Sequence, residues 1–271
     1  MTFDALDTNA VLETSECAAF APIEMHSDDQ IARSIDKMAG GFGNQLFARE
    51  TAKTLAGTVS AAPKWLPFAS ESYEISSDIR DYIMVPVVIA PSDIPNRNKT
   101  AFPFVELSRW SPQAGKLTYE TWQGKPTHID HINRDWRKAK GVVMDVSMSQ
   151  MPGRAGKPWK VIALCGFDRG KDAALANDIL TGTRSTYSMG AMVSYYSCSV
   201  CGSCAEHGSG KKLPCGNRHV SQHGPFKTFS VDGQQVLAHY NAHDFVGFEV
   251  SSVTLPAWAS AATDPSSHVS Y

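Results

Sequence analysis

Short apolar runs alternate with polar stretches that contain Gly and Pro from about residue 81 onwards. Many of these runs are rich in β-branched residues, which is typical of β-strands. One segment, 171–180, instead places Leu175 and Ile179 at helical spacing, and Gly182 follows at a favourable stop position. The expected strands are 82–89, 117–122, 141–148, 159–167, 183–193, 227–231 and 245–254. Many strands and few helices predict an α+β domain with a β-barrel-like sheet rather than a doubly wound parallel sheet.

The two ends of the chain have a different pattern. Residues 1–76 are rich in Ala, Ser, Thr and acidic residues, and their clearest helical candidate is 28–37. We expect this region to be a loosely structured N-terminal extension or propeptide, the alternative being an irregular arm that packs on the domain. The folded domain is expected over 77–260, and 261–271 is expected to be a disordered tail.

Composition excludes several classes of function. A chain of 271 residues with 42% hydrophobic and 19% charged residues is typical of one globular domain. The net charge of −2 gives no basic field, so nucleic acid is not an expected partner. The longest apolar stretch, 83–90, is too short to cross a bilayer, and the N-terminus lacks the pattern of a secretory signal. We therefore expect a cytoplasmic protein without membrane contact.

Three short segments in the second half carry a histidine, a serine and a carboxylate in strand-like surroundings. They read DHIN at 130–133, YSMG at 187–190 and EVSSV at 249–253. A serine hydroxyl is a weak nucleophile that needs an imidazole base, and the imidazole in turn needs an orienting partner. The three residue types together favour a nucleophilic hydrolase, although chance trios of this kind are easy to find in a chain with nine histidines.

The amino-acid sequences of these segments narrow the class of protein. Together with PNRN at 95–98, YETWQGKP at 119–126 and Pro256-Ala257, they resemble the prohead (capsid maturation) serine proteases of tailed bacteriophages, which are related in fold to the herpesvirus assemblins. The resemblance runs from about residue 82 to about residue 259. It implies an assemblin-type serine endopeptidase that processes scaffold, major capsid and internal head proteins, and itself. It also implies a location in the host cytoplasm inside the prohead, with retention in the virion, and activation as a homodimer.

The resemblance assigns roles to individual residues. Ser188 would be the nucleophile, with Gly190 leaving room for a substrate backbone, whereas the ordinary alternative is a strand serine with a satisfied hydroxyl. His131 would be the general base, because an unperturbed histidine titrates near neutrality. His128, three residues earlier, competes for that role, but it is more simply a neighbour or a substrate-side residue.

The third member of the catalytic group is expected to be acidic. Assemblins use a second histidine, whereas the phage relatives use an acidic residue after the serine. Glu249 matches the closing strand motif of the family and is the first choice. Asp145 is the runner-up, because a carboxylate within the apolar run 142–146 would be costly to bury unpaired. The ordinary alternative for both is a structural carboxylate that holds an arginine.

The resemblance also implies a cleavage preference for glutamate preceded two positions earlier by a small or apolar residue. Glu74, in Ser72-Tyr73-Glu74, has this arrangement near the start of the domain, and Glu16 has it within the extension. We therefore expect self-cleavage near Glu74, which would remove the N-terminal region.

Four of the six cysteines fall within 198–215, and cysteine pairs with two residues between them favour a metal site in a reducing cytosol. A tetrahedral zinc needs four ligands, and Cys198, Cys201, Cys215 and His219 have the most finger-like spacing, with Cys204 and His207 as alternatives. The Cys/His-rich insertion would span 197–224. A full set of four protein ligands leaves no open position, so the expected role of the zinc is structural.

Two other functions compete with the protease. A non-enzymatic, zinc-stabilised head core or scaffold protein would tolerate alanine at Ser188. A zinc hydrolase would lose activity with a chelator and ignore serine-acylating reagents. Both explain less of the sequence, because neither accounts for the DHIN, SMG and EVSSV segments together.

Overall fold

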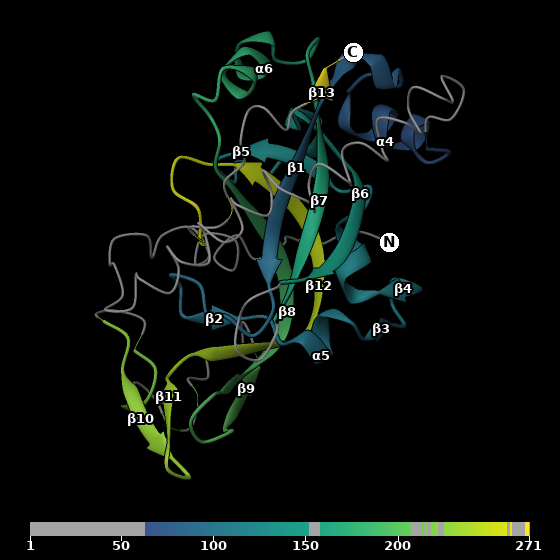
Figure 1. Cartoon of the computed structure of the whole chain (residues 1–271). Helices are drawn as coiled ribbons and strands as arrows, with labels where there is room; N and C mark the ends of the chain where they lie inside the picture. The colour runs from purple at the N-terminus through teal and green to yellow at the C-terminus, as the bar shows by residue number, and fades with distance from the viewer. Residues whose placement is uncertain are drawn as a thin grey trace.

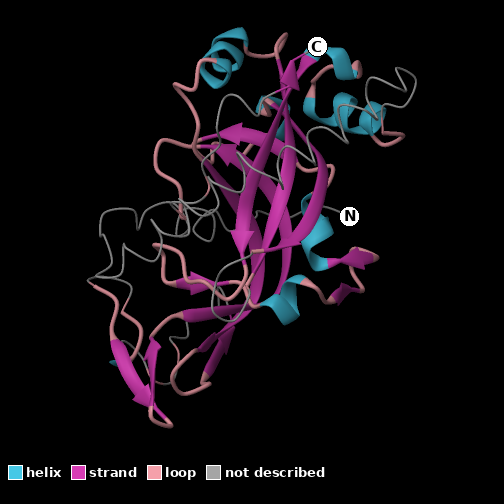
Figure 2. Cartoon of the chain, in the orientation of Figure 1, coloured by secondary structure: helices cyan, strands magenta, loops and turns pink. Residues whose placement is uncertain are grey.

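The computed structural model describes residues 63–151, 158–206, 213, 215, 218–221, 225–258, 261 and 269–270. The helix expected over 28–37 and the glutamate at position 16 lie outside these residues. The described chain is an α+β fold with many strands and few helices, as the sequence predicts (Figure 2).

One large, strongly curled sheet forms the centre of the described molecule (Figure 1). Its strand order is β13-β1-β7-β6-β5-β12-β8-β9, and β2 also pairs with β12. The pairs β12–β5 and β12–β2 are parallel, and the other neighbours are antiparallel. The strands are β1 (Tyr82–Pro91), β2 (Thr100–Ala101), β5 (Pro126–Ile129), β6 (Gly141–Gln150), β7 (Trp159–Asp168), β8 (Tyr187–Cys198), β9 (Cys204–Glu206), β12 (Tyr240–Ser252) and β13 (Val269–Ser270).

The core follows from the apolar runs. Every residue of β1 is buried, because other side chains cover this strand on both faces of the curled sheet. The largest group of buried side chains collects around β1, β7, β8 and β12, and it includes Trp122, Phe245 and Trp258. Burying such side chains contributes roughly 25 cal/mol per Å² of apolar surface and is the main source of stability.

Helices occupy the rim of the sheet (Figure 1). In α6 (Ala173–Leu180) the carboxylate of Asp172 caps the first turn by accepting a hydrogen bond from Leu175 N at 2.9 Å. Leu175 and Ile179 are buried and Gly182 follows with a φ of 77°, so the helix expected from the sequence is confirmed. The other helical segments are α4 (Leu66–Tyr73), α5 (Phe104–Leu107) and the 3₁₀ helices η1 (Ile79–Asp81), η2 (Thr118–Trp122) and η3 (Trp136–Lys138).

The strand expected over 117–122 is wrong. This segment forms η2, preceded by the two-residue strand β4 (Lys116–Leu117), which pairs with β3 (Trp110–Ser111). The Glu120 carboxylate accepts a hydrogen bond from Leu117 N at 2.9 Å, and Thr121 Oγ1 donates to the Thr118 carbonyl at 2.6 Å. These local bonds replace the ladder bonds that a strand would need. The other six expected strands are present with shifted ends, whereas β5 was not expected.

The folded domain extends beyond both of its expected boundaries, 77 and 260. Residues 63–76 were assigned to the extension, yet Leu66, Ala69 and Ile75 are buried against Tyr82 and Met84. The described part of that region therefore belongs to the folded domain. Similarly, β13 lies in the expected disordered tail but pairs with the start of β1.

Strands β8 and β12 continue beyond the main sheet into an arm (Figure 1). The arm also contains β9, the edge strand of the same sheet, and the separate hairpin of β10 (Thr228–Val231) and β11 (Gln234–Leu237). A small separate core of Cys198, Leu213, Val220 and Ala238 holds the arm together. Among the described helices, none has the length and apolar character needed to cross a membrane.

Candidate active site

Three neighbouring strands bring the predicted site residues together on one face of the sheet. Ser251 on β12 lies directly opposite Ser188 on β8 and directly opposite His128 on β5. Glu249, two residues before Ser251, is opposite Gly190. Residues directly opposite each other share a face, with Cβ atoms about 5 Å apart. The segments that the sequence singles out are therefore adjacent in space.

Glu249 is the centre of the hydrogen-bond network. Its side chain is fully buried, and each carboxylate oxygen has its own partner. Oε1 lies 2.6 Å from His131 Nδ1, and Oε2 accepts a hydrogen bond from Ser251 Oγ at 2.6 Å. Hydrogen bonds to an ionised carboxylate are short and strong, and they compensate for its burial. Glu249 thus orients His131 and does not hold an arginine.

A tight turn after β5 directs His131 back over the sheet. Asp130 and His131 both have positive φ values, 48° and 56°, which is uncommon for residues other than glycine. The turn is held because Asp130 Oδ1 accepts from Thr254 N at 3.1 Å and Asp130 Oδ2 pairs with Arg184 at 3.3 Å. Backbone strain of this kind costs about 1–3 kcal/mol per residue and concentrates at functional sites.

The electrostatics of His131 suit a general base. Burial by itself would lower the pKa of His131, since its side chain is only 5% exposed. The charge of Glu249 and the hydrogen bond to it outweigh burial, so the pKa of His131 is raised above its usual value of 6.5. With Nδ1 bonded to the carboxylate, Nε2 is the nitrogen left to take a proton.

Ser188 lies next to this pair but is not bonded to it. The residue is 3% exposed, and no hydrogen bond joins its hydroxyl to His131 within the described chain. Its position is fixed through Ser251, which is opposite Ser188 and accepts a hydrogen bond from His131 N at 3.3 Å. Catalytic hydrogen bonds are often loose before substrate binds, so this arrangement is compatible with a nucleophile and its base.

Gly190 makes room for the Glu249 side chain and not, as expected from the sequence, for a substrate backbone. A Cβ at this position would lie 2.6 Å from Phe248 Cζ and 2.7 Å from Glu249 Oε1. The space above Gly190 is therefore filled by the Glu249 carboxylate rather than kept open for a substrate backbone. The Gly190 carbonyl also accepts a hydrogen bond from Trp122 Nε1 at 3.0 Å, which ties η2 to the site.

The two competing residues occupy different environments. His128 is 1% exposed and burial lowers its pKa, which favours the neutral imidazole; its Nδ1 has no hydrogen-bond partner among the described residues. Asp145 is exposed on β6, just after a bulge, and bonds to Gln123 Nε2 at 3.4 Å and to Val146 N at 2.9 Å. The bulge turns Asp145 out of the buried run, although partial burial still raises the pKa of its carboxyl. No hydrogen bond joins Asp145 to His131 among the described residues.

Two contributors to the site were missed by the sequence interpretation. Ser251 links Glu249, His131 and Ser188, and its signal is the Glu-x-Ser spacing, which places both side chains on one face of a strand. The strained turn at Asp130 gives no comparable signal, because its conformation depends on Thr254 and Arg184, which are more than fifty residues away along the chain.

A candidate metal centre lies in the arm, at the opposite end of β8. Cys198 Sγ, Cys201 Sγ, Cys215 Sγ and a His219 ring nitrogen all lie within 4.8 Å of one another. A tetrahedral zinc with bonds near 2.3 Å would hold sulfur ligands about 3.8 Å apart, so this donor set fits such an ion after a small contraction. The four ligands expected from the spacing are thus brought together.

The surroundings of the cluster favour metal binding. Hydrogen bonds from Ser203 hold the pKa of the Cys201 thiol at about 6, which favours the thiolate that binds metals. Burial acts in the opposite direction at Cys198 and raises the pKa of its thiol, so there a metal would have to displace the proton. His219 packs edge-on against Phe229 of β10, with ring centroids 5.0 Å apart. Cys204 is exposed and bonds to the Gly202 carbonyl outside the cluster, and His207 lies outside the described residues.

Comparisons with known proteins add no family to this picture. Family models, curated proteins and solved structures all give no match for the chain. The site's own geometry therefore carries the functional argument.

Proposed function

We propose that the chain is a serine endopeptidase in which Ser188 is the nucleophile, His131 the general base and Glu249 the orienting carboxylate. The observation that supports this most directly is the buried His131–Glu249 pair, 2.6 Å long, on the same face as Ser188. A neutral cluster of strand residues would not need a fully buried carboxylate paired with an imidazole. The fold proposed for the domain is of the assemblin type.

In this mechanism Ser188 Oγ attacks a peptide carbonyl and its proton passes to His131 Nε2. Glu249 stabilises the imidazolium that forms and keeps Nδ1 protonated. His131 then returns the proton to the leaving amine, and water releases the acyl-enzyme by the same route. Ser251 supports Glu249 from the other side by donating to Oε2, so the carboxylate is held in one orientation.

The local strand pairing suits an extended peptide substrate. At Ser188, β8 pairs with β12 on one side, and its second neighbour in the described sheet, β9, begins to pair only at Tyr195. On that side Tyr187 N donates to the Ala261 carbonyl at 2.7 Å, so a substrate segment can align beside β8 from Met189 onwards and present its carbonyl to Ser188.

The sequence segments that resemble prohead proteases supply the biological setting of the proposal. The substrates would be the scaffold, major capsid and internal head proteins of an immature phage head, and the enzyme would act in the host cytoplasm, inside the prohead. Activation by homodimerisation is part of the same proposal.

Self-cleavage after Glu74 would require local opening. Glu74 ends α4 with a φ of 53°, its carbonyl accepts a hydrogen bond from Lys171 Nζ at 2.9 Å, and the next residue, Ile75, is buried. A protease binds its substrate in an extended form, so α4 must detach before this bond can be cut. We therefore expect slow self-processing near Glu74.

The decisive experiment compares intact mass over time for the wild type, Ser188→Ala and Ser194→Ala. Ser194 lies on the same strand and its hydroxyl bonds to Asp244 rather than to a histidine, which makes it a matched control. The wild type and the control should shorten at a glutamate while Ser188→Ala stays full length. If all three proteins behave alike with head proteins present, the protease proposal is wrong.

The Cys₃His cluster favours a second candidate, a non-enzymatic head core or scaffold protein stabilised by zinc. We propose zinc as the metal because thiolate and imidazole ligands in a closed set of four suit it. In both candidates the zinc is structural and stabilises the arm. The candidates differ at Ser188, since the scaffold protein would be indifferent to alanine there.

A further inference from the structure

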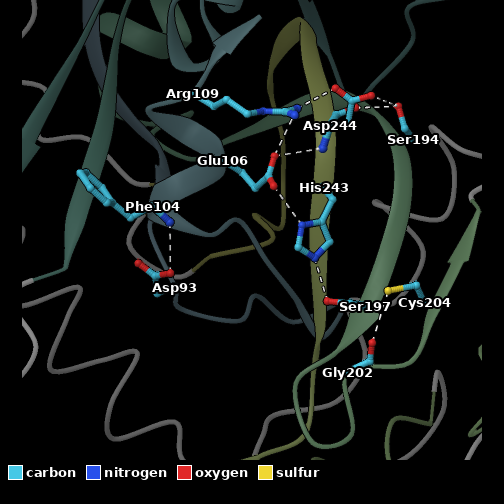
Figure 3. A network of polar contacts seen from close by, with 10 residues as sticks. All are labelled: Asp93, Phe104, Glu106, Arg109, Ser194, Ser197, Gly202, Cys204, His243 and Asp244. Carbon is cyan, nitrogen blue, oxygen red and sulfur yellow. Dashed lines mark hydrogen bonds and ion pairs between the residues drawn. The ribbon is translucent and has the colours of Figure 1, made fainter.

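A second serine–histidine–carboxylate chain lies at the other end of the same two strands. Ser197 Oγ is 2.7 Å from His243 Nε2, and His243 Nδ1 is 3.1 Å from Glu106 Oε1 (Figure 3). Both imidazole nitrogens are therefore engaged in the pattern of a nucleophile, a base and an orienting carboxylate. This group contains neither the residues of the site described above nor the expected metal ligands.

The carboxylate in this chain is held firmly. Glu106 belongs to α5, and its Oε2 accepts hydrogen bonds from Asp244 N at 3.2 Å and pairs with Arg109 at 3.3 Å. Arg109 also pairs with Asp244 at 2.6 Å, as Figure 3 shows. Glu106 is thus left with Oε1 directed at His243 Nδ1, which favours the tautomer with a proton on Nδ1 and a lone pair on Nε2.

The imidazole is equally well fixed. His243 lies opposite Tyr195 in the β8–β12 pair, and the two rings stack with centroids 4.7 Å apart and planes 9° apart. Ser197 is two residues further along β8, on the same face, so its hydroxyl reaches Nε2 diagonally. Neighbouring side chains alternate along a strand, so Cys198 is directed to the opposite face, toward His219.

The group is accessible from solvent. The side chain of His243 is 19% exposed and that of Glu106 is 14% exposed, and Ser197 is itself partly exposed. An adjacent imidazole in a fixed tautomer, oriented by a carboxylate, raises the nucleophilicity of a serine, and the exposure lets a substrate reach the hydroxyl.

We propose that Ser197 is a second reactive serine, which accepts an acyl group from small carboxylic esters. Ser197 Oγ attacks the ester carbonyl, and its proton passes to His243 Nε2. The carbon–oxygen bond to the alcohol breaks, and His243 gives the proton to the departing alkoxide. Water then hydrolyses the acyl-serine, with His243 again transferring the proton. Glu106 acts as a positioning residue.

The strand pairing separates this substrate class from that of Ser188. At Ser197, β8 is paired with β12 at Asn241 and with β9 at Cys204. Both sides of the strand are in use there, so an extended peptide has no strand edge with which to pair. A small ester needs no such edge and can reach the hydroxyl from the exposed face.

The test uses the full-length Ser188→Ala protein, in which the proposed protease nucleophile is absent. It is treated with para-nitrophenyl acetate, and the acetylated peptide is located by mass spectrometry. We expect acetylation at Ser197, and we expect the rate of para-nitrophenol release in the first turnover to fall about 100-fold when His243→Gln is added. Adding Ser230→Ala, which removes an exposed hydroxyl on β10, should leave that rate unchanged. Thermal unfolding of each variant verifies that the fold is kept.

Glu106→Gln should lower the rate of para-nitrophenol release. Glu106→Asp, which keeps the carboxylate, should recover part of that rate, whereas a purely structural role would give similar losses in both variants. The acetylated residue is located in the Ser188→Ala protein without any further substitution, so a second variant that fails to fold does not block the test. Absence of acetyl-Ser197 in the parent protein would overturn the proposal. Because Ser188 is missing throughout, this result is independent of whether the protease proposal holds.

Discussion

A serine, a histidine and a carboxylate meet at each end of the β8–β12 pair, and the two groups are built differently. The third member comes from outside the pair in both: His131 from the turn after β5, and Glu106 from α5. At the Ser188 end the imidazole–carboxylate pair is buried and short, 2.6 Å, but the serine is not bonded to it. At the Ser197 end all three groups are bonded, yet they lie near the surface and the imidazole–carboxylate distance is 3.1 Å.

The two groups show that a complete hydrogen-bond chain and a buried imidazole–carboxylate pair are separate features, and the proposed peptidase site has only the second. A buried pair acts in a low-dielectric environment, where its electrostatic effect on a transition state is larger than at the surface. The pairing of β8 differs as well, because β8 has described strands on both sides at Ser197 and on one side at Ser188. Under the two proposals, these differences direct peptides to the Ser188 end and small esters to the Ser197 end.

The largest expected effect separates the two carboxylates. Glu249→Gln should reduce peptide cleavage about 10³- to 10⁴-fold, because the amide no longer fixes the imidazole tautomer or stabilises its charge. Glu106→Gln should leave peptide cleavage within about twofold of wild type while reducing ester reactivity in the Ser188→Ala protein. Rates on a peptide and on para-nitrophenyl acetate check both halves. Equal losses of peptide cleavage in the two variants would contradict the assignment.

The next effect concerns the metal centre, which lies beside the Ser197 end. Cys198→Ser should weaken zinc binding about 100-fold or more, since it removes one of four ligands. Cys204→Ser is the matched control and should bind normally, because Cys204 bonds outside the cluster. Zinc competition with a coloured chelator measures both affinities. Equal weakening in the two variants would show that the ligand set differs from the one described.

A smaller effect is expected from Gly190→Ala. The added methyl group would press on Glu249 and Phe248 and cost about 1–3 kcal/mol of stability, as overpacking usually does. Peptide cleavage should fall roughly 10-fold through the displaced carboxylate, whereas acylation of Ser197 should not change. Gly233→Ala offers a control. Alanine is strained at the φ of 79° that Gly233 adopts, but nothing lies within 4 Å of the added Cβ, and Gly233 lies far from Glu249. An unchanged cleavage rate in Gly190→Ala would argue against Glu249 as the orienting group.

The smallest effect is a shift along the pH axis. His131 must be neutral to act as a base and its pKa is raised, so peptide cleavage should increase with pH through a midpoint above 6.5. In Glu249→Gln burial remains and the charge is lost, so the residual activity should have its midpoint below 6.5.

The same raised pKa has a consequence for stability. The ion pair stabilises the fold fully below the unfolded-state pKa near 6.5, and this contribution is lost as pH rises through the folded-state pKa. Thermal unfolding at a series of pH values should therefore show a small loss of stability on the alkaline side in the wild type that Glu249→Gln lacks.

The cleavage measurement has its own contradicting outcome. If the pH midpoint of cleavage is the same in Glu249→Gln as in the wild type, Glu249 does not set the pKa of His131.

How far the sequence reaches depends on whether a signal is local. The strands β1, β6, β7, β8 and β12 were predicted, because long apolar runs must be buried whatever lies next to them. The segment 117–122 was misassigned, because its side chains bond to their own backbone and its Trp122 is buried by β8 and β12 rather than by a strand neighbour. Residues 63–76 were placed outside the domain because a short helix with few apolar residues gives a weak periodic signal.

The sequence by itself determined which side chains were available: a cysteine and histidine set with metal-binding spacing, and a histidine, a serine and a carboxylate in strand-like segments. Spacing along one segment is a local property, so the four residues that cluster as a candidate metal site are the four expected from the sequence. Only the tertiary structure decided that Glu249 rather than Asp145 meets His131, that Ser251 links them, and that Ser197 meets His243 and Glu106. Those contacts depend on strand register and on one bulge, and a shift of one residue would turn each side chain to the other face of the sheet.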